Sequence, residues 1–339
     1  MDPRDDQSWR AVPVPWTRRW GRRVVALAVL GGLVALGGLL YEPVAERLDL
    51  RNAPAPGRVV TTGGQGLHLQ VAGPPSHPVV LLFNGWGMPS SSWGWILPEV
   101  ARTHLVVRWD PPGYAWSDAT EGPVDAAAQV ERLRAALGAQ ELTGPYVLVG
   151  TGLGALEARV FAARHPDEVA GLVLLDPWHR PLLADPAPRI EALRQEARAR
   201  RFSWPRFRAW WRKEPPPEFG LPPADEAAQL AALRTVAQVE AAAAELQALP
   251  ATLAQVEAND TFGQRPVVVL TSAALDKDGS DGPWAPGTEA ARIQMDDLLA
   301  KLSTQGEHRV VAGATPVSLV CRQDLSGQVT RAIDRCLGR

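Results

Sequence analysis

The sequence predicts an α/β domain, built on a mostly parallel sheet flanked by helices and covered by a helical cap, with one membrane-spanning helix before it. From residue 58 onward, short apolar runs of strand length alternate with helical stretches, which is the pattern of successive βαβ units. Before that point, residues 24–41 form an apolar run of 18 residues without a charge. The chain has 339 residues, of which 46% are hydrophobic, enough for one large domain in addition to this run.

The apolar run has the length and flanks of a membrane anchor. As a helix rising about 1.5 Å per residue it would extend about 27 Å, close to the hydrocarbon thickness of a bilayer. It follows six arginines: Arg4, Arg10, Arg18, Arg19, Arg22 and Arg23. The charges after it are mixed, so the positive-inside rule predicts a cytoplasmic tail at residues 1–23 and a domain across the membrane. A cleaved signal peptide is the alternative, but no A-x-A cleavage site follows, which favours an uncleaved single-pass anchor.

The stretch 42–57 ends in the proline-rich sequence N-A-P-A-P-G and is expected to be a linker. The domain is then expected over residues 58–339. Apolar runs predict strands at 58–62, 67–71, 79–83, 104–109, 146–149, 169–175, 266–271 and 309–312. Helical patterns predict helices at 92–102, 124–137, 154–164, 289–302 and 326–337.

The alternation of strands and helices breaks over about residues 180–263, which are helical and are expected to form the cap. The breaker E-P-P-P at 214–217 divides this region. Within it, residues 189–213 contain nine Arg and Lys residues, two glutamates and five aromatic residues. This composition predicts either a solvated helix whose arginine stems cover apolar surface or a cap that rests on an anionic membrane surface.

Charge and cysteine content narrow the classes of function. The formal net charge of −2 carries no signature of nucleic-acid binding. The two cysteines, Cys321 and Cys336, lack the C-x-x-C spacing and nearby histidines of a zinc site, so neither a metal nor a cofactor is expected. Buried thiols and a disulfide both remain open for this pair.

Four short motifs, in chain order, point to one superfamily. The segment 82–87, L-F-N-G-W-G, resembles the oxyanion motif H-G-x-G with Asn84 in place of histidine, and 109–118 is similar to the D-x-P-G-x-G-x-S turn. Residues 150–154, G-T-G-L-G, have the frame of the nucleophile elbow G-x-S-x-G. The segment 169–177, V-A-G-L-V-L-L-D-P, is similar to the strand that follows the elbow helix. Together these motifs resemble the α/β-hydrolase superfamily, of the esterase and lipase type, over residues 58–337.

The resemblance implies a catalytic triad whose residues are changed in this chain. The serine of the elbow corresponds to Gly152, and the histidine after the last strand corresponds to Thr315. The acid would be Asp276 or Asp278 after the strand at 266–271. Acyl transfer needs a nucleophile and a base, and these residue types supply neither. The resemblance also implies an oxyanion hole made by the backbone amides of Trp86 and Leu153, which does not depend on side-chain identity.

Other residues at the same edge of the sheet could bind a ligand or rescue activity. Asn84, Trp116 and Trp178 follow different strands and are expected, with Trp86, to line an aromatic ligand pocket. His179 and Asp176 follow the strand at 169–175 and could form a water-activating pair.

The sequence therefore predicts a membrane-anchored protein with a degenerate triad, which binds a small apolar ligand or a protein partner without hydrolysing it. The alternative is an active, esterase-type hydrolase that uses a non-standard constellation built on His179 and an aspartate.

Overall fold

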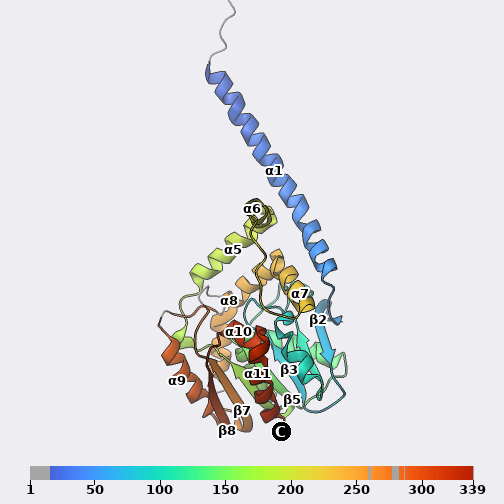
Figure 1. Cartoon of the computed structure of the whole chain (residues 1–339), viewed down its shortest axis with the longest axis vertical. Helices are drawn as coiled ribbons and strands as arrows, with labels where there is room; N and C mark the ends of the chain where they lie inside the picture. The colour runs from blue at the N-terminus through green and yellow to red at the C-terminus, as the bar shows by residue number, and fades with distance from the viewer. Residues whose placement is uncertain (1–15, 259–260, 277–281, 286, 339) are drawn as a thin grey trace, which may run out of the picture.

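The computed structural model describes residues 16–258, 261–276, 282–285 and 287–338, and a central sheet organises most of them (Figure 1). The sheet has eight strands in the order β1-β2-β4-β3-β5-β6-β7-β8. The strands are β1 Arg58–Thr62, β2 Gln65–Ala72, β3 Val79–Phe83, β4 Val106–Trp109, β5 Tyr146–Thr151, β6 Val169–Leu175, β7 Gly263–Ser272 and β8 Ser303–Val311. The chain has the α/β-hydrolase fold, as predicted.

The direction of the strands brings the motif loops to one edge of the sheet. Strand β2 pairs antiparallel with β1 and β4, whereas β4, β3, β5, β6, β7 and β8 pair in parallel. Residues of β3, β4 and β5 are buried throughout, because helices cover both faces of a parallel sheet. Since parallel strands end at the same edge, the loops after β3, β5, β6, β7 and β8 meet there.

Two hydrophobic layers hold the helices to the sheet. One face packs against α3 Ala126–Gly138, α4 Leu153–Arg164 and α9 Glu289–Ala300, through side chains such as Val130, Leu156 and Leu299. The other face packs against α2 Ile96–Val100, α10 Pro316–Cys321 and α11 Gln323–Cys336, through Ile96 and Ile333 among others.

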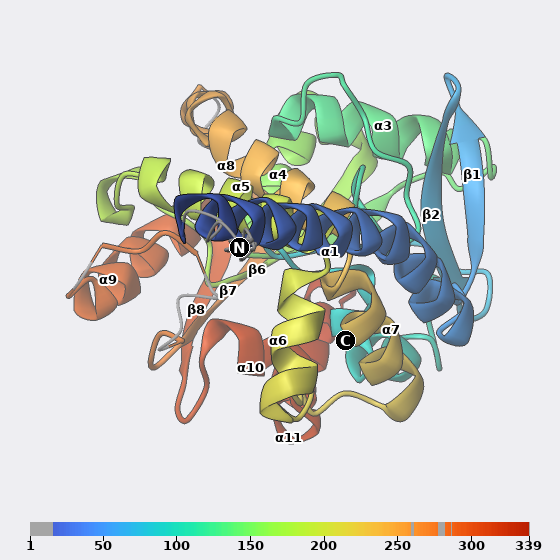
Figure 2. The same ribbon diagram turned by 90° about the horizontal axis from the view of Figure 1, so that it is seen from above.

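The cap consists of four helices between β6 and β7, in the region where the alternation breaks. These helices are α5 Ala187–Arg201, α6 Trp204–Arg212, α7 Pro223–Leu233 and α8 Val236–Glu257. Figure 2 shows them from above, with α6 and α7 on one side of the N-terminal helix and α5 and α8 on the other.

The N-terminal helix α1 is longer than the predicted anchor. It extends over Trp16–Asn52 and continues through Pro43 into the stretch expected to be a linker. This second half is helical because it packs on the cap, where Ala45 and Glu42 are buried, a tertiary contact that composition does not reveal. Among the described residues, Trp20–Asn52 contains the one helix long and apolar enough to span a bilayer. Residues 1–15 of the predicted tail lie outside the described part of the chain.

Three other elements differ from the prediction. The helix expected at 92–102 is a 3-10 turn, Ser90–Trp93, followed by the short α2, and Gly94 between them lies against Pro222 and Asp225 of the cap. Strand β8 starts earlier than expected, at Ser303. The first residues of this edge strand are largely polar, so no apolar run marks them in the sequence. Helix α10 was not expected, and Thr315 is its N-cap residue.

Candidate functional site

The elbow keeps its sharp turn although it presents no side chain. Gly152 connects β5 to α4 with φ 54° and ψ −113°. A Cβ atom on Gly150 would lie 2.3 Å from the Gly154 carbonyl oxygen, and one on Gly154 would lie 2.3 Å from the Asn84 carbonyl oxygen. These two positions therefore require glycine. Around Gly152, by contrast, the nearest atoms belong to the side chain of Trp178, so backbone crowding does not exclude a serine there.

The indole of Trp178 takes the space above the elbow. Its Nε1 atom lies 3.2 Å from the position of a Cβ on Gly152, and the three atoms nearest to that position all belong to this ring. The ring is fully buried and packs against Trp86 and Trp284, with ring centroids 6.3 Å and 6.4 Å away. The three tryptophans form an aromatic cluster over the position of the nucleophile, and we call Trp86, Trp178 and Trp284 the tryptophan cluster.

The acid and base positions of the triad remain neighbours. The Thr315 hydroxyl donates a hydrogen bond of 2.5 Å to Asp276 Oδ1, and the Val317 amide donates to Asp276 Oδ2 at 3.0 Å. Thr315 also caps α10 together with Ser318. Asp276 thus stabilises a helix N-terminus, where a carboxylate is favourable. Asp278, the other acid considered, lies outside the described residues.

The two residues whose backbone amides were expected to form an oxyanion hole lie at the same edge of the sheet. Trp86 follows β3, and Leu153 is the first residue of α4, so both amides lie at the elbow edge of the sheet. The Trp86 loop is fixed by α8, because the Trp86 indole donates to the Ala242 carbonyl at 2.8 Å and Gln238 donates to the Gly87 carbonyl at 3.1 Å. These contacts hold the loop rigidly against the cap.

Asn84 supports this loop from below. Its amide donates to the Trp109 carbonyl at 2.8 Å, and its oxygen accepts from Trp93 Nε1 at 2.9 Å. The side chain is buried in these bonds and does not line the cavity described below. Trp116 is also away from that cavity and packs on His68 at 5.1 Å.

His179 and Asp176 do not pair with each other, so the combination considered from the sequence is corrected. His179 Nε2 lies 2.6 Å from Asp296 Oδ1 of α9, whereas Asp176 forms a buried ion pair with Arg292 and accepts from the Ser272 amide at 2.8 Å. Asp176 directly follows β6, whereas His179 lies three residues further along the loop, and the two side chains contact different partners. Burial raises the pKa of Asp176 to about 7, although the Arg292 guanidinium opposes this shift.

A pair of buried glutamates lies between the elbow helix α4 and helix α8 of the cap. Glu245 of α8 accepts a hydrogen bond from the Tyr114 hydroxyl, and Glu157 of α4 is buried close to it. Burial raises the pKa of Glu245 to about 8 and that of Glu157 well above its ordinary value, with Glu245 adding to the shift at Glu157. Neither glutamate was expected to be buried, since helical periodicity in alanine-rich stretches marks no clear polar face.

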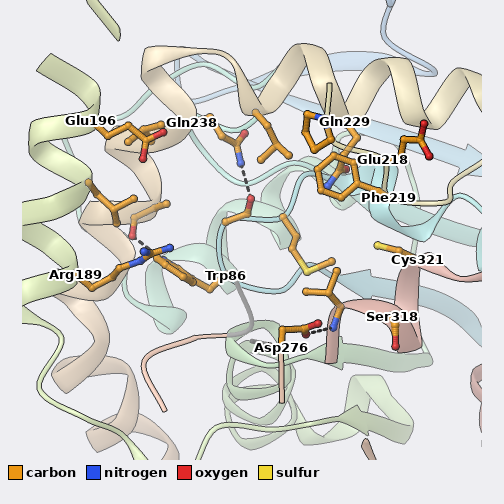
Figure 3. Close-up of a pocket in the computed structure, with 18 of the residues that line it drawn as sticks. Trp86, Arg189, Glu196, Glu218, Phe219, Gln229, Gln238, Asp276, Ser318 and Cys321 are labelled. Carbon is orange, nitrogen blue, oxygen red and sulfur yellow. Dashed lines mark hydrogen bonds between the residues drawn. The ribbon is translucent and has the colours of Figure 1, made fainter. Parts of the chain in front are cut away.

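A cavity of about 490 Å³ lies between the cap and the edge of the sheet, and Figure 3 shows its lining. Trp86 and Arg189 form one wall, and Phe219 and Cys321 lie opposite. The guanidinium of Arg189 stacks over Trp86 at 5.4 Å. Trp86 belongs both to this wall and to the tryptophan cluster, whereas Gly152 and Trp178 do not line the cavity. The cavity is therefore adjacent to the elbow but separated from it by indole rings.

Both cysteines are buried and free, which resolves the alternatives left by their spacing. Burial raises the pKa of each thiol to about 12, so neither is a thiolate nucleophile near neutral pH.

Comparison with known proteins agrees with the fold. The family model described as alpha/beta hydrolase fold matches residues 78–220. The solved structure of a membrane phospholipase A, described as a bacterial virulence factor, superimposes with a TM-score of 0.58 at 17% identity, covering 95% of this chain and 100% of that one. With the sheet order and the motif loops, these findings show that the chain has the alpha/beta hydrolase fold.

Two yeast relatives share part of the sequence. An uncharacterized protein of Schizosaccharomyces pombe is 40% identical over 81 residues, which are 24% of this chain and 15% of the relative. An uncharacterized vacuolar membrane protein of Saccharomyces cerevisiae is 34% identical over 110 residues, 31% of this chain and 17% of the relative. The matches thus span less than a fifth of either relative, and their similarity concerns a segment only.

Proposed function

We propose that this protein is a membrane-anchored, non-catalytic member of the superfamily, which binds a small apolar ligand in the cavity beneath its cap. The observation that carries the proposal is the position of Trp178, whose indole occupies the space above Gly152. A chain that had lost only its serine would leave that space open to substrate and water.

The base position supports the same conclusion. A triad histidine takes the proton of the nucleophile, but the Thr315 hydroxyl donates a hydrogen bond to Asp276 and cannot act as a base near neutral pH. Gly152 supplies no nucleophile, so covalent acyl transfer has neither of its two reacting groups.

The cavity offers what a binding site needs. Apolar and aromatic residues such as Trp86, Leu193 and Phe219 form much of its wall. Polar residues also line it, and six of them are charged: Arg189, Glu196, Arg200, Glu218, Asp276 and Arg322. An apolar ligand that carries a polar or charged group would fit this mixed wall. Its volume of about 490 Å³ lies within the range of small-molecule sites.

The N-terminal helix supports a place at a membrane. Its apolar residues are exposed along the part that would span the bilayer, and the arginines before it favour a cytoplasmic N-terminus with the domain on the opposite side. A partial relative is named for the vacuolar membrane, which agrees with this assignment. Protease protection of the full chain in sealed vesicles tests the topology, and a domain digested from the cytoplasmic side would reverse it.

Ligand binding is tested with the purified full chain in detergent and the fluorescent fatty acid 11-dansylaminoundecanoate. Leu193→Trp places a larger ring in the cavity, and we expect it to weaken binding at least about tenfold, equivalent to ~1.4 kcal/mol. Leu298→Trp is the matched control, because Leu298 is exposed on α9 outside the cavity. Equal binding by both variants would place the probe elsewhere.

Catalysis is tested on the same preparation with short-chain esters and a fluorophosphonate probe. The proposal expects no covalent labelling and no turnover above the buffer rate. The second candidate is a hydrolase that uses the His179–Asp296 pair, which the 2.6 Å contact favours. Turnover that His179→Ala abolishes would establish that candidate and refute the non-catalytic one.

A further inference from the structure

Helix α6 exposes an unusual set of aromatic side chains. Trp210 and Trp211 are 73% and 72% exposed, and Trp204 is 57% exposed. Phe207 packs within 6.3 Å of all three, so the rings form one continuous aromatic surface. No residue of α6 is buried. Tryptophan at this exposure is costly in water, and a helix that is aromatic on one side and cationic elsewhere is typical of a membrane interface.

This helix lies against the membrane-spanning part of α1. The Ser203 Oγ atom lies 3.1 Å from the Gly38 carbonyl oxygen, and a Cβ on Gly38 would lie 2.2 Å from the Phe202 carbonyl oxygen. Gly38 belongs to the apolar run at 24–41. Helix α6 is therefore level with the domain-side end of that run, as Figure 1 shows.

Ion pairs fix α6 in this place. Arg206 donates to Glu42 at 2.8 Å and to Asp49 at 2.7 Å, and Ser203 donates to Glu42 at 2.6 Å. Glu42 is only 2% exposed, so the pair is held out of water. Because α1 and α6 are joined by buried charges, α6 must take the depth in the bilayer that α1 gives it.

A groove of about 500 Å³ separates the outer surfaces of the two helices. Val34, Gly37 and Tyr41 line it from α1, and Phe207 and Trp210 line it from α6. The cationic residues Arg208, Arg212 and Lys213 stand in and just after the same short helix. These three cations do not line the groove, but they lie on or directly after the helix that forms one side of it. An apolar groove for acyl chains and cations for phosphate on one short helix are complementary to a phospholipid surface.

We propose that α6 is a second membrane contact, an interfacial helix whose aromatic surface enters the leaflet beside α1. The lipid bilayer is the occupant of the surface, because the surface is continuous with a helix of spanning length and is flanked by cations. This inference is independent of the proposed ligand site. Helix α5 precedes α6 and lines the cavity, so a membrane contact of α6 would also fix the position of α5 beside the cavity.

The test uses the full chain in nanodiscs of phosphatidylcholine and phosphatidylglycerol. Trp210→Cys carries an NBD fluorophore on a position that is already exposed, while the native Cys321 and Cys336 are buried and do not react. We expect a blue-shifted emission that nitroxide-labelled lipid quenches. Arg102→Cys is the matched control, since its side chain is 74% exposed on the domain body, and its label should emit as in water.

A second measurement does not depend on labelling. With Trp16 and Trp20 replaced by Phe, bromolipid should quench part of the tryptophan emission, and Trp204→Phe, Trp210→Phe and Trp211→Phe together should remove most of that quenching. Trp116→Phe should leave it unchanged, because Trp116 packs on His68 in the body of the domain. Emission at position 210 that stays water-like, or quenching that the triple replacement leaves intact, overturns the proposal. A blue shift that lipid quenchers leave unaffected and that grows with protein-to-lipid ratio would assign the surface to a second copy of the chain, and also overturns it.

Discussion

The indole nitrogen of Trp178 lies 3.2 Å from the point where Gly152 would carry a Cβ atom. The elbow backbone keeps its sharp turn, with φ 54° at Gly152, and a buried indole ring lies against the position that a side chain there would take. The absence of a hydroxyl and the presence of the indole are two separate obstacles to catalysis, and they can be separated by substitution.

The first prediction concerns restoration of the triad. Gly152→Ser with Thr315→His supplies a nucleophile and a base beside Asp276, but we expect no turnover, because Trp178 still covers the serine. Adding Trp178→Leu should open the space and give measurable hydrolysis of p-nitrophenyl butyrate and labelling by a fluorophosphonate.

Trp178→Leu alone is the control for this experiment and should be inactive. Removing a buried indole costs about 3–5 kcal/mol in the larger Trp→Ala change, so thermal melts must show that each variant is folded. Activity in the double variant would contradict the blocking role of the indole, and a folded but inert triple variant would show that the oxyanion amides are displaced.

The sequence predicts the elbow at Gly152, but it does not predict that the Trp178 ring lies against this residue. The strand, turn and helix of the elbow were predicted from the motif G-T-G-L-G and the apolar runs around it. The turn depends on glycine at fixed positions, and the strand is apolar because it is buried in a parallel sheet. Trp178 was expected to line a pocket, and only the packing of Trp86 and Trp284 around it shows that it faces the elbow instead. Likewise, the partner of His179 is 117 residues away in α9, a distance that no local pattern reports.

The junction between anchor and cap supplies the second prediction. Gly38→Ala would place a methyl group 2.2 Å from the Phe202 carbonyl oxygen, so α6 must move away from α1. Gly37→Ala is the matched control in the same helix turn, where no atom lies within 4 Å of the new methyl. We expect Gly38→Ala to speed proteolysis between α5 and α7 in detergent and Gly37→Ala to leave the rate unchanged. Equal rates would mean that the close contact contributes nothing to cap stability.

Asp276 is the subject of the third prediction. Because it accepts from the Thr315 hydroxyl and the Val317 amide, Asp276→Ala removes a cap from α10 and should lower the free energy of unfolding by about 1–2 kcal/mol. Asp324→Ala is the control, since Asp324 pairs with the exposed Arg322 and a surface pair contributes about 0–1 kcal/mol. Chemical denaturation measures the free energy of unfolding of both variants. A loss no larger than that of the control would leave Asp276 without a structural role.

The buried glutamates predict how stability changes with pH. The pKa of Glu245 is about 8 in the folded chain against 4.5 for an ordinary glutamate, chiefly because the carboxyl is buried. Folding therefore favours the neutral form, so its stability contribution is complete below about pH 4.5 and is lost as the pH rises toward 8. At about 1.4 kcal/mol per pKa unit, the loss is on the order of several kcal/mol.

The pKa of Glu157 is also raised, partly by Glu245, so Glu157 changes the stability in the same direction. The Tyr114 hydroxyl donates a hydrogen bond to Glu245. Glu245→Gln stays neutral at every pH and can still accept that hydrogen bond, so we expect it to flatten the decline in melting temperature between pH 5 and pH 9. Glu240→Gln changes an exposed residue of the same helix and should keep the decline of the parent chain. A decline as steep in Glu245→Gln as in Glu240→Gln would show that Glu245 is ionised in the folded chain, with its charge compensated by its neighbours.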